Sequence, residues 1–155
     1  KQLQIIDAED GLWGYTYPWV QEAVARLSAQ GYRMSVISNS DGRVGAELES
    51  VRLAHYFEKV FDSHIVGYAK PDPRLFAHAL THLGLRPEEC LFVGDVYYVD
   101  VLGANRSGIA AVHLDPCGLY DGWAGYHLRT IADLPNFLAS NDLNLQSEMF
   151  FPLRP

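Results

Sequence analysis

Basic residues and long apolar runs are what this sequence has least of. Lys and Arg together number 12 against 19 Asp and Glu, which gives a formal net charge of −7. Nucleic acids and anionic membranes are bound through a basic protein face, so this balance argues against both as partners. No apolar run approaches the roughly 18 residues that a membrane-spanning helix needs. We therefore expect a protein that binds neither nucleic acid nor membrane.

Cysteine is also scarce. Cys90 and Cys117 match no metal-ligand spacing, and a single pair makes no disulfide framework. A reducing, cytoplasmic setting is therefore the expected one. The histidines show no metal-ligand spacing either, since His78 and His82 stand at helical distance without a glutamate between them. The six histidines are His55, His64, His78, His82, His113 and His127.

The chain has the length and composition of one globular domain. It holds 155 residues, of which 48% are hydrophobic and 20% charged, and this is enough to bury a substantial core. Residues 141–155 show no clean period. We therefore assign residues 1–140 to one core domain and residues 141–155 to a tail.

Short apolar runs alternate with stretches of helical periodicity along the core domain. Strands that alternate with helices form βαβ units, so we predict an α/β fold with a Rossmann-like, mostly parallel sheet flanked by helices. The predicted helices cover residues 18–30, 44–53, 75–83, 99–107 and 131–138. Strand-like runs occupy residues 34–37, 57–61, 65–67, 91–93 and 109–114, and residues 115–126 are expected to form an ordered loop.

Residues with useful chemistry follow the ends of the predicted strands. Ser38 and Asn39 come directly after one strand, and Asp95 comes after another with Asp100 five residues later. Lys70 stands in a loop behind a third strand-like run. In open α/β sheets, ligands bind at the carboxyl ends of the strands. A hydroxyl, an amine and an acidic pair at this edge suit magnesium-assisted phosphoryl transfer, although Asp100 alone could be an ordinary helix-surface carboxylate.

Three segments that contain these residues resemble motifs two, three and four of the haloacid dehalogenase superfamily. They are residues 36–39 (Val-Ile-Ser-Asn), residues 70–76 (Lys-Pro-Asp-Pro-Arg-Leu-Phe), and residues 92–95 (Phe-Val-Gly-Asp) through Asp100. Their order and spacing both agree with the family, and the resemblance extends over about residues 13–138. One such motif would be weak, whereas three in the correct order are specific.

The resemblance implies Mg²⁺ as cofactor and hydrolysis of a small phosphorylated metabolite through an aspartyl-phosphate. A minority of the family acts on carbon–halogen bonds instead. Carried over by position, Ser38 and the backbone N–H of Asn39 would bind the phosphoryl oxygens, and Lys70 would neutralise their charge. Asp95 would bind Mg²⁺, and Asp100 would support Lys70 or a metal-bound water.

The first motif of the family is not present in its usual form. That motif is a nucleophilic Asp with a second Asp two residues later, and no Asp-x-Asp-Gly-Thr occurs here. Residues 12–18 resemble what precedes motif two in members with a helical cap, so we expect the nucleophile strand and the cap to lie upstream of Lys1. The alternative is that residues 3–11 form a degenerate first motif, in which Asp7 is the nucleophile and Glu9 the acid/base of a capless enzyme.

Two other functions remain open from the sequence. A non-catalytic relative would keep the phosphate pocket and bind phosphate without turnover, and the missing Asp-x-Asp favours this alternative. A receiver-type signalling domain also combines Asp, Ser or Thr, and Lys on a parallel sheet. In that type the acidic pair stands on the first strand, whereas here it comes last.

Aromatic residues are dense before the first predicted helix. Trp13, Tyr15, Tyr17 and Trp19 would pack in a core by default. If upstream sequence normally covers them, they would be exposed, and an exposed aromatic patch predicts a homodimer or aggregation.

Overall fold

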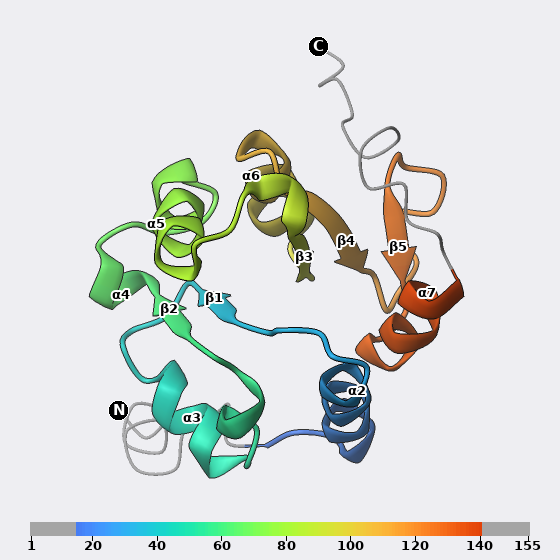
Figure 1. The fold of residues 1–155 in the computed structure, drawn as a ribbon. Coiled ribbons are helices and arrows are strands. Elements are labelled where there is room, and N and C mark those ends of the chain that lie inside the picture. Colours follow the sequence, from blue (N-terminus) through green and yellow to red (C-terminus); the bar gives the residue numbers. More distant parts are fainter. Residues whose placement is uncertain (1–14, 141–155) are drawn as a thin grey trace, which may run out of the picture.

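The strands within residues 15–140 are short, and all their pairings are parallel. The structure is a computed structural model that describes residues 15–140. Strands β1 (Val36–Ser38) and β2 (Val60–Asp62) pair with each other. Strands β3 (Leu91–Gly94), β4 (Ala110–Leu114) and β5 (Tyr126–Leu128) form a second group in that order. Parallel strands flanked by helices confirm the predicted α/β fold (Figure 1).

The helices lie around the strands in Figure 1. The α-helices are α2 (Pro18–Ala29), α3 (Val44–Ser50), α4 (Ser63–Val66), α5 (Pro73–Leu83), α6 (Leu102–Arg106) and α7 (Leu134–Ser140). Short 3₁₀ turns occupy Ala54–Tyr56, Pro87–Glu89 and Ile131–Asp133, and a π-helical segment, Tyr97–Val101, precedes α6. No helix within residues 15–140 is long and apolar enough to cross a membrane.

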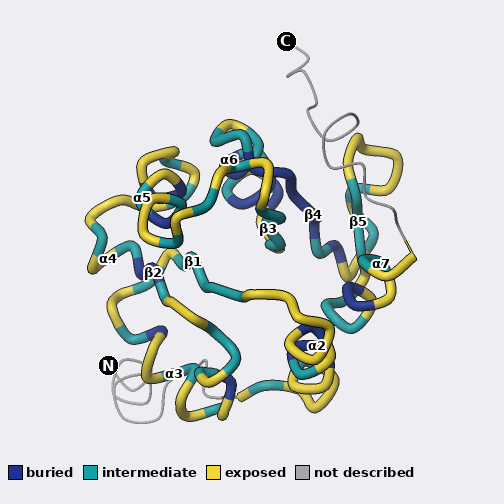
Figure 2. The backbone as a smooth tube through the Cα atoms, viewed as in Figure 1, coloured by how far each residue is buried: buried dark blue, intermediate teal, exposed yellow. Residues whose placement is uncertain are grey.

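Helix α5 supplies the centre of the core. Its side chains Leu75 and Phe76 are completely buried, as is Val112 on β4. Figure 2 shows buried backbone segments on both elements. Ile37 of β1 and Phe92 of β3 both pack against the cluster that contains Phe76. The same helix therefore contacts both groups of strands.

The sheet is divided between β1 and β3. Within residues 15–140, β1 pairs with β2 alone and β3 pairs with β4 alone, so each of β1 and β3 has one edge without a partner strand. In Figure 1, β1 and β3 are the inner strands of the two groups. The backbone groups on these two edges are therefore available to a further strand.

The strand-like run at residues 65–67 was predicted wrongly, because it is the end of helix α4. Asp62 caps this helix by accepting a hydrogen bond from the N–H of His64 at 2.9 Å, and Gly67 ends it in the left-handed conformation with φ of 86°. Ile65 is 73% exposed, so its apolar side chain does not mark a buried strand. A run of two apolar residues is too short to distinguish the two structures by periodicity.

Other boundaries differ by a few residues. The predicted helix over 44–53 ends at Ser50, and a turn follows in which Arg52 has φ of 59°. The loop expected over 115–126 leads into β5, which the sequence analysis did not predict. The assignment of residues 141–155 to a tail lies outside the described residues.

Candidate active site

The loop after β1 is joined to the loop that carries Lys70 by the side chain of Asn39. Its Oδ1 accepts a hydrogen bond from the backbone N–H of Lys70 at 2.7 Å, and its Nδ2 donates to the carbonyl of Lys70 at 2.9 Å. The Asn39 side-chain amide thus makes both of its hydrogen bonds to the backbone of Lys70, and these two bonds fix the relative position of the two loops. Ser38, directly before Asn39, is the last residue of β1 and lies at the same edge.

The end of β2 supports the loop after β1. Asp62, buried to 2% exposure, accepts a hydrogen bond from the N–H of Gly42 at 3.0 Å. The hydroxyl of Ser63 accepts from the N–H of Ser40 at 3.0 Å and lies 3.1 Å from its carbonyl. These contacts hold the segment that follows Ser38, a supporting role that the sequence analysis did not assign. The parallel pairing of β1 with β2 brings the ends of the two strands together, so Asp62 and Ser63 could have been proposed as supporting residues from their place at the end of a predicted strand.

Lys70 and Asp100 form an ion pair away from bulk water. Lys70 Nζ lies 2.7 Å from Asp100 Oδ1, and the two side chains are only 12% and 5% exposed. Asp100 Oδ2 also accepts a hydrogen bond from the N–H of Val96 at 2.9 Å. The ammonium lies 5.3 Å from the centre of the Phe92 ring, on which it gains a cation–π contact. Asp100 is therefore not a helix-surface carboxylate but the buried partner of Lys70.

Gly94 makes room for Asp100. A Cβ atom at position 94 would lie 2.4 Å from Cβ and 2.6 Å from Cγ of Asp100, which no real pair of atoms tolerates. Glycine is required here for close approach, because the carboxylate folds back against the strand that precedes it.

We expect Gly94→Ala to lower the free energy of unfolding by about 1–3 kcal/mol, the usual cost of inserting a methyl group into a packed site. Urea denaturation followed by circular dichroism measures this change. Gly45→Ala is the matched control, since a Cβ there meets nothing within 4 Å and the residue lies in helix α3. That control should gain about 0.5–1 kcal/mol, and equal stability of the two variants would remove the steric argument.

Asp95 presents a carboxylate at the end of β3. The residue is exposed, and within residues 15–140 its side chain has no hydrogen-bond or ion-pair partner. Its backbone carbonyl accepts a hydrogen bond from His113 at 3.1 Å. Mg²⁺ prefers carboxylate oxygens and keeps several waters, so a solvent-facing carboxylate without a competing cation fits that ion.

The structure thus joins three of the predicted site residues by direct contacts. Asn39, Lys70 and Asp100 form a continuous chain of hydrogen bonds and an ion pair. Ser38 and Asp95 are the sequence neighbours of Asn39 and Gly94, respectively. Asp7 and Glu9 lie outside the described residues. The catalytic roles of all these residues stay predictions.

No histidine spacing along the sequence indicated a metal site, but the structure brings two distant histidines together. His113 and His127 are 14 residues apart, yet their Nδ1 atoms are 3.1 Å apart. They are register partners on β4 and β5. Spacing along one segment could not reveal them, because β5 was not predicted.

Comparison with known proteins gives a consistent result. The haloacid dehalogenase-like hydrolase family matches residues 5–108. The chain is 34% identical over 97 residues to a glyceraldehyde 3-phosphate phosphatase of Methanothermobacter thermautotrophicus, a match that covers 62% of this chain and 43% of the relative. It is 39% identical over 100 residues to a phosphoserine phosphatase of Thermus thermophilus, covering 64% of this chain and 40% of that protein.

A solved structure agrees with these relatives. The crystal structure of a HAD phosphatase from Thermococcus onnurineus has a TM-score of 0.76 at 25% identity. The match covers 89% of this chain and 64% of that one. The chain therefore spans less than half of the length of the two curated relatives, 43% and 40%.

Proposed function

The chain belongs to the haloacid dehalogenase-like hydrolases, and we propose that it forms part of a Mg²⁺-dependent phosphatase that acts on a small phosphorylated metabolite. The buried ion pair between Lys70 and Asp100 is the observation that supports this proposal best. An ammonium that is desolvated, fixed by a carboxylate and tied by its own backbone to the end of β1 is placed to meet an anionic group. The two relatives named above, a glyceraldehyde 3-phosphate phosphatase and a phosphoserine phosphatase, favour a phosphoryl group.

In the proposed reaction, a carboxylate oxygen of the nucleophilic Asp attacks phosphorus, and the bond between phosphorus and the ester oxygen breaks. The ester oxygen stays on the departing alcohol. A second acid donates the proton that the alcohol requires. Water then hydrolyses the aspartyl-phosphate, which releases inorganic phosphate and restores the carboxylate. Throughout, Ser38 and the N–H of Asn39 would hold the phosphoryl oxygens, and Lys70 would offset their charge.

Asp95 would supply a ligand to Mg²⁺. When bound, that ion neutralises charge on the phosphoryl group. Asp100 would keep the Lys70 ammonium in its position through their 2.7 Å contact.

The divided sheet bears on where the nucleophile comes from. The unpaired edges of β1 and β3 could accept one more parallel strand between them. We propose that the nucleophile strand fills this position, since its carboxyl end would then lie between Ser38 and Asp95. Either residues 3–7, which end in Asp7, or a segment of a longer protein could supply it.

Phosphate release distinguishes these sources. We expect the folded chain, given p-nitrophenyl phosphate, to release phosphate only with Mg²⁺ present if Asp7 is the nucleophile, and Asp7→Asn should then abolish turnover. If the nucleophile lies elsewhere, the folded chain shows no turnover, and activity requires the longer protein. Turnover that is unaffected by both Mg²⁺ removal and Asp7→Asn would contradict the proposal. A 2-haloacid, assayed for halide release, tests the carbon–halogen alternative of the same family.

A non-catalytic relative is the second candidate, and the absence of Asp-x-Asp-Gly-Thr from the sequence favours it. Such a protein would bind inorganic phosphate, with Lys70→Met weakening binding, yet hydrolyse no ester in any form of the protein. The receiver-type alternative loses its support, because the family match accounts for the same residues. The homodimer and the cytoplasmic setting stay predictions.

A further inference from the structure

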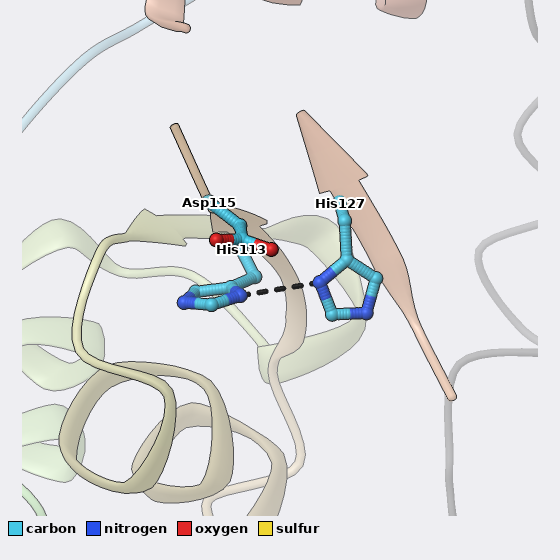
Figure 3. A group of neighbouring side chains, drawn as sticks. All are labelled: His113, Asp115 and His127. Atoms are coloured by element: carbon cyan, nitrogen blue, oxygen red, sulfur yellow. Dashed lines mark hydrogen bonds between the residues drawn. The ribbon is translucent and has the colours of Figure 1, made fainter. Parts of the chain in front are cut away.

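A second group of ligand-type side chains lies on β4, on β5 and directly after β4. His113 lies on β4, Asp115 is the first residue after that strand, and His127 is the register partner of His113 on β5. The three side chains converge in Figure 3. His113 and Asp115 are buried to 2% and 3% exposure, and His127 is partly buried.

The spacing of their polar atoms is close to that of a metal's ligands. One ligand atom from each residue lies within 4.8 Å of the other two, and the two Nδ1 atoms are 3.1 Å apart. Tetrahedral Zn²⁺ with bonds of about 2.0–2.1 Å separates its ligands by roughly 3.4 Å. Small side-chain rotations would bring the carboxylate to this distance, whereas the two nitrogens already lie near it.

The outer contacts of His113 orient its ring for metal binding. Its Nε2 lies 3.1 Å from the carbonyl oxygen of Asp95, and a carbonyl only accepts, so Nε2 carries the proton. Nδ1 then keeps its lone pair and accepts the hydrogen bond that His127 Nδ1 donates at 3.1 Å, a contact that a bound metal ion would replace. A histidine that ligates a metal through one nitrogen commonly donates from the other to a carbonyl or carboxylate.

Asp115 is held in place by groups that leave ligand positions free. Its oxygens accept hydrogen bonds from the N–H groups of Leu119 at 3.0 Å and Tyr120 at 2.9 Å. A carboxylate has about four acceptor positions, so two N–H donors do not exhaust it.

The guanidinium of Arg129 lies near the Asp115 carboxylate, where its positive charge would oppose the binding of a cation. Arg129 Nη1 lies 3.6 Å from Asp115 Oδ2, but its Nη2 is bound to Asp121 at 2.8 Å. Aromatic rings also contact the two histidines: Tyr97 stacks on His127, and Tyr120 meets His113 edge to face at 4.7 Å between centroids. An apolar shell of this kind limits competition from water.

We propose that His113, Asp115 and His127 bind one divalent transition-metal ion of the Zn²⁺ and Co²⁺ class. Two imidazoles and one carboxylate suit such ions, whereas Mg²⁺ prefers oxygen ligands alone. Three protein ligands leave a fourth position to water. This site is separate from the one assigned to Asp95, to which His113 connects it through a backbone carbonyl, and it does not depend on phosphatase activity.

The test uses Zn²⁺ alone, by isothermal titration calorimetry, and Co²⁺ alone, by the visible absorption of a four-coordinate ion. We expect one ion per chain, and at least about a hundredfold weaker binding with loss of the Co²⁺ band in His127→Gln. The matched controls are the double variant His78→Gln/His82→Gln, which removes an adjacent pair on α5 with ring centroids 4.1 Å apart, and Cys117→Ser. Both controls should bind as the unaltered chain does.

Equal binding by His127→Gln and the unaltered chain would overturn the proposal, as would loss of binding in either control. A further measurement needs no variant that might fail to fold. In ¹⁵N spectra of the imidazoles, Zn²⁺ should shift the Nδ1 signals of His113 and His127 and leave those of His78 and His82 unchanged. Zinc-induced shifts confined to His78 and His82, or no shifts at all, would equally overturn it.

Discussion

Lys70→Met should lower the free energy of unfolding by about 3–5 kcal/mol, because the change leaves the carboxylate of Asp100 buried without its cation. The pair is 2.7 Å apart, and the Asp100 side chain is only 5% exposed, so solvent cannot replace the ammonium. In a form of the protein that releases phosphate, the same change should also reduce kcat about 10²–10³-fold, the typical cost of losing one preorganised charge-stabilising group. Urea denaturation and phosphate release measure the two effects.

Two control variants distinguish the effect of burying the Lys70–Asp100 pair from the effect of its charge. Arg33→Met removes one member of the exposed pair with Glu58, 2.7 Å apart, whose side chains are 58% and 42% exposed, and should cost less than about 1 kcal/mol. The double variant Lys70→Met/Asp100→Asn should regain much of the stability, since no charge is left buried, but none of the activity. If Lys70→Met were as mild as Arg33→Met, the pair would not be desolvated in solution.

Asp95→Asn should abolish Mg²⁺-dependent phosphate release while leaving stability nearly unchanged. Loss of metal-assisted charge stabilisation, several kcal/mol, corresponds to about a thousandfold in rate. Stability should be preserved because the Asp95 carboxylate is exposed and has no polar partner within residues 15–140. Its contact with His113 uses the backbone carbonyl, which the substitution retains.

Metal binding provides a readout that needs no turnover. Mn²⁺, used in place of Mg²⁺ and followed by electron paramagnetic resonance, should bind more weakly to Asp95→Asn than to the unaltered protein. His127→Gln is included so that binding at the histidine cluster is not mistaken for binding at Asp95. Turnover by Asp95→Asn equal to that of the unaltered protein at saturating Mg²⁺ would remove this residue from the metal site.

The positions of Ser38, Asn39 and Asp95 could be predicted because they lie at or directly after the ends of apolar strands, whereas Lys70 follows helix α4 and not the strand that was expected. Apolar runs end at Ser38 and at Gly94, and the carboxyl ends of parallel strands share one edge of a sheet. The way in which the loops are held together could not be predicted. Asn39 bonds to the backbone of Lys70, a residue 31 positions away, and no local pattern encodes that contact.

Local patterns also failed where an element was very short. The apolar residues before Gly67 belong to a four-residue helix, whose type is decided by the Asp62 cap rather than by periodicity. Strand β5 was not predicted either, and it is recognised by its parallel pairing with β4. The meeting of His113 with His127 depends on that pairing, so it becomes visible only in three dimensions.

The divided sheet would make completion of the fold and acquisition of the reactive group a single event. If one strand fills the position between β1 and β3, it would bridge both groups of strands and deliver its terminal carboxylate in the same step. A change that weakens the pairing of this strand would then reduce both the cooperativity of folding and the catalytic activity. A strand supplied as a separate peptide could switch both on at once, as in fragment complementation.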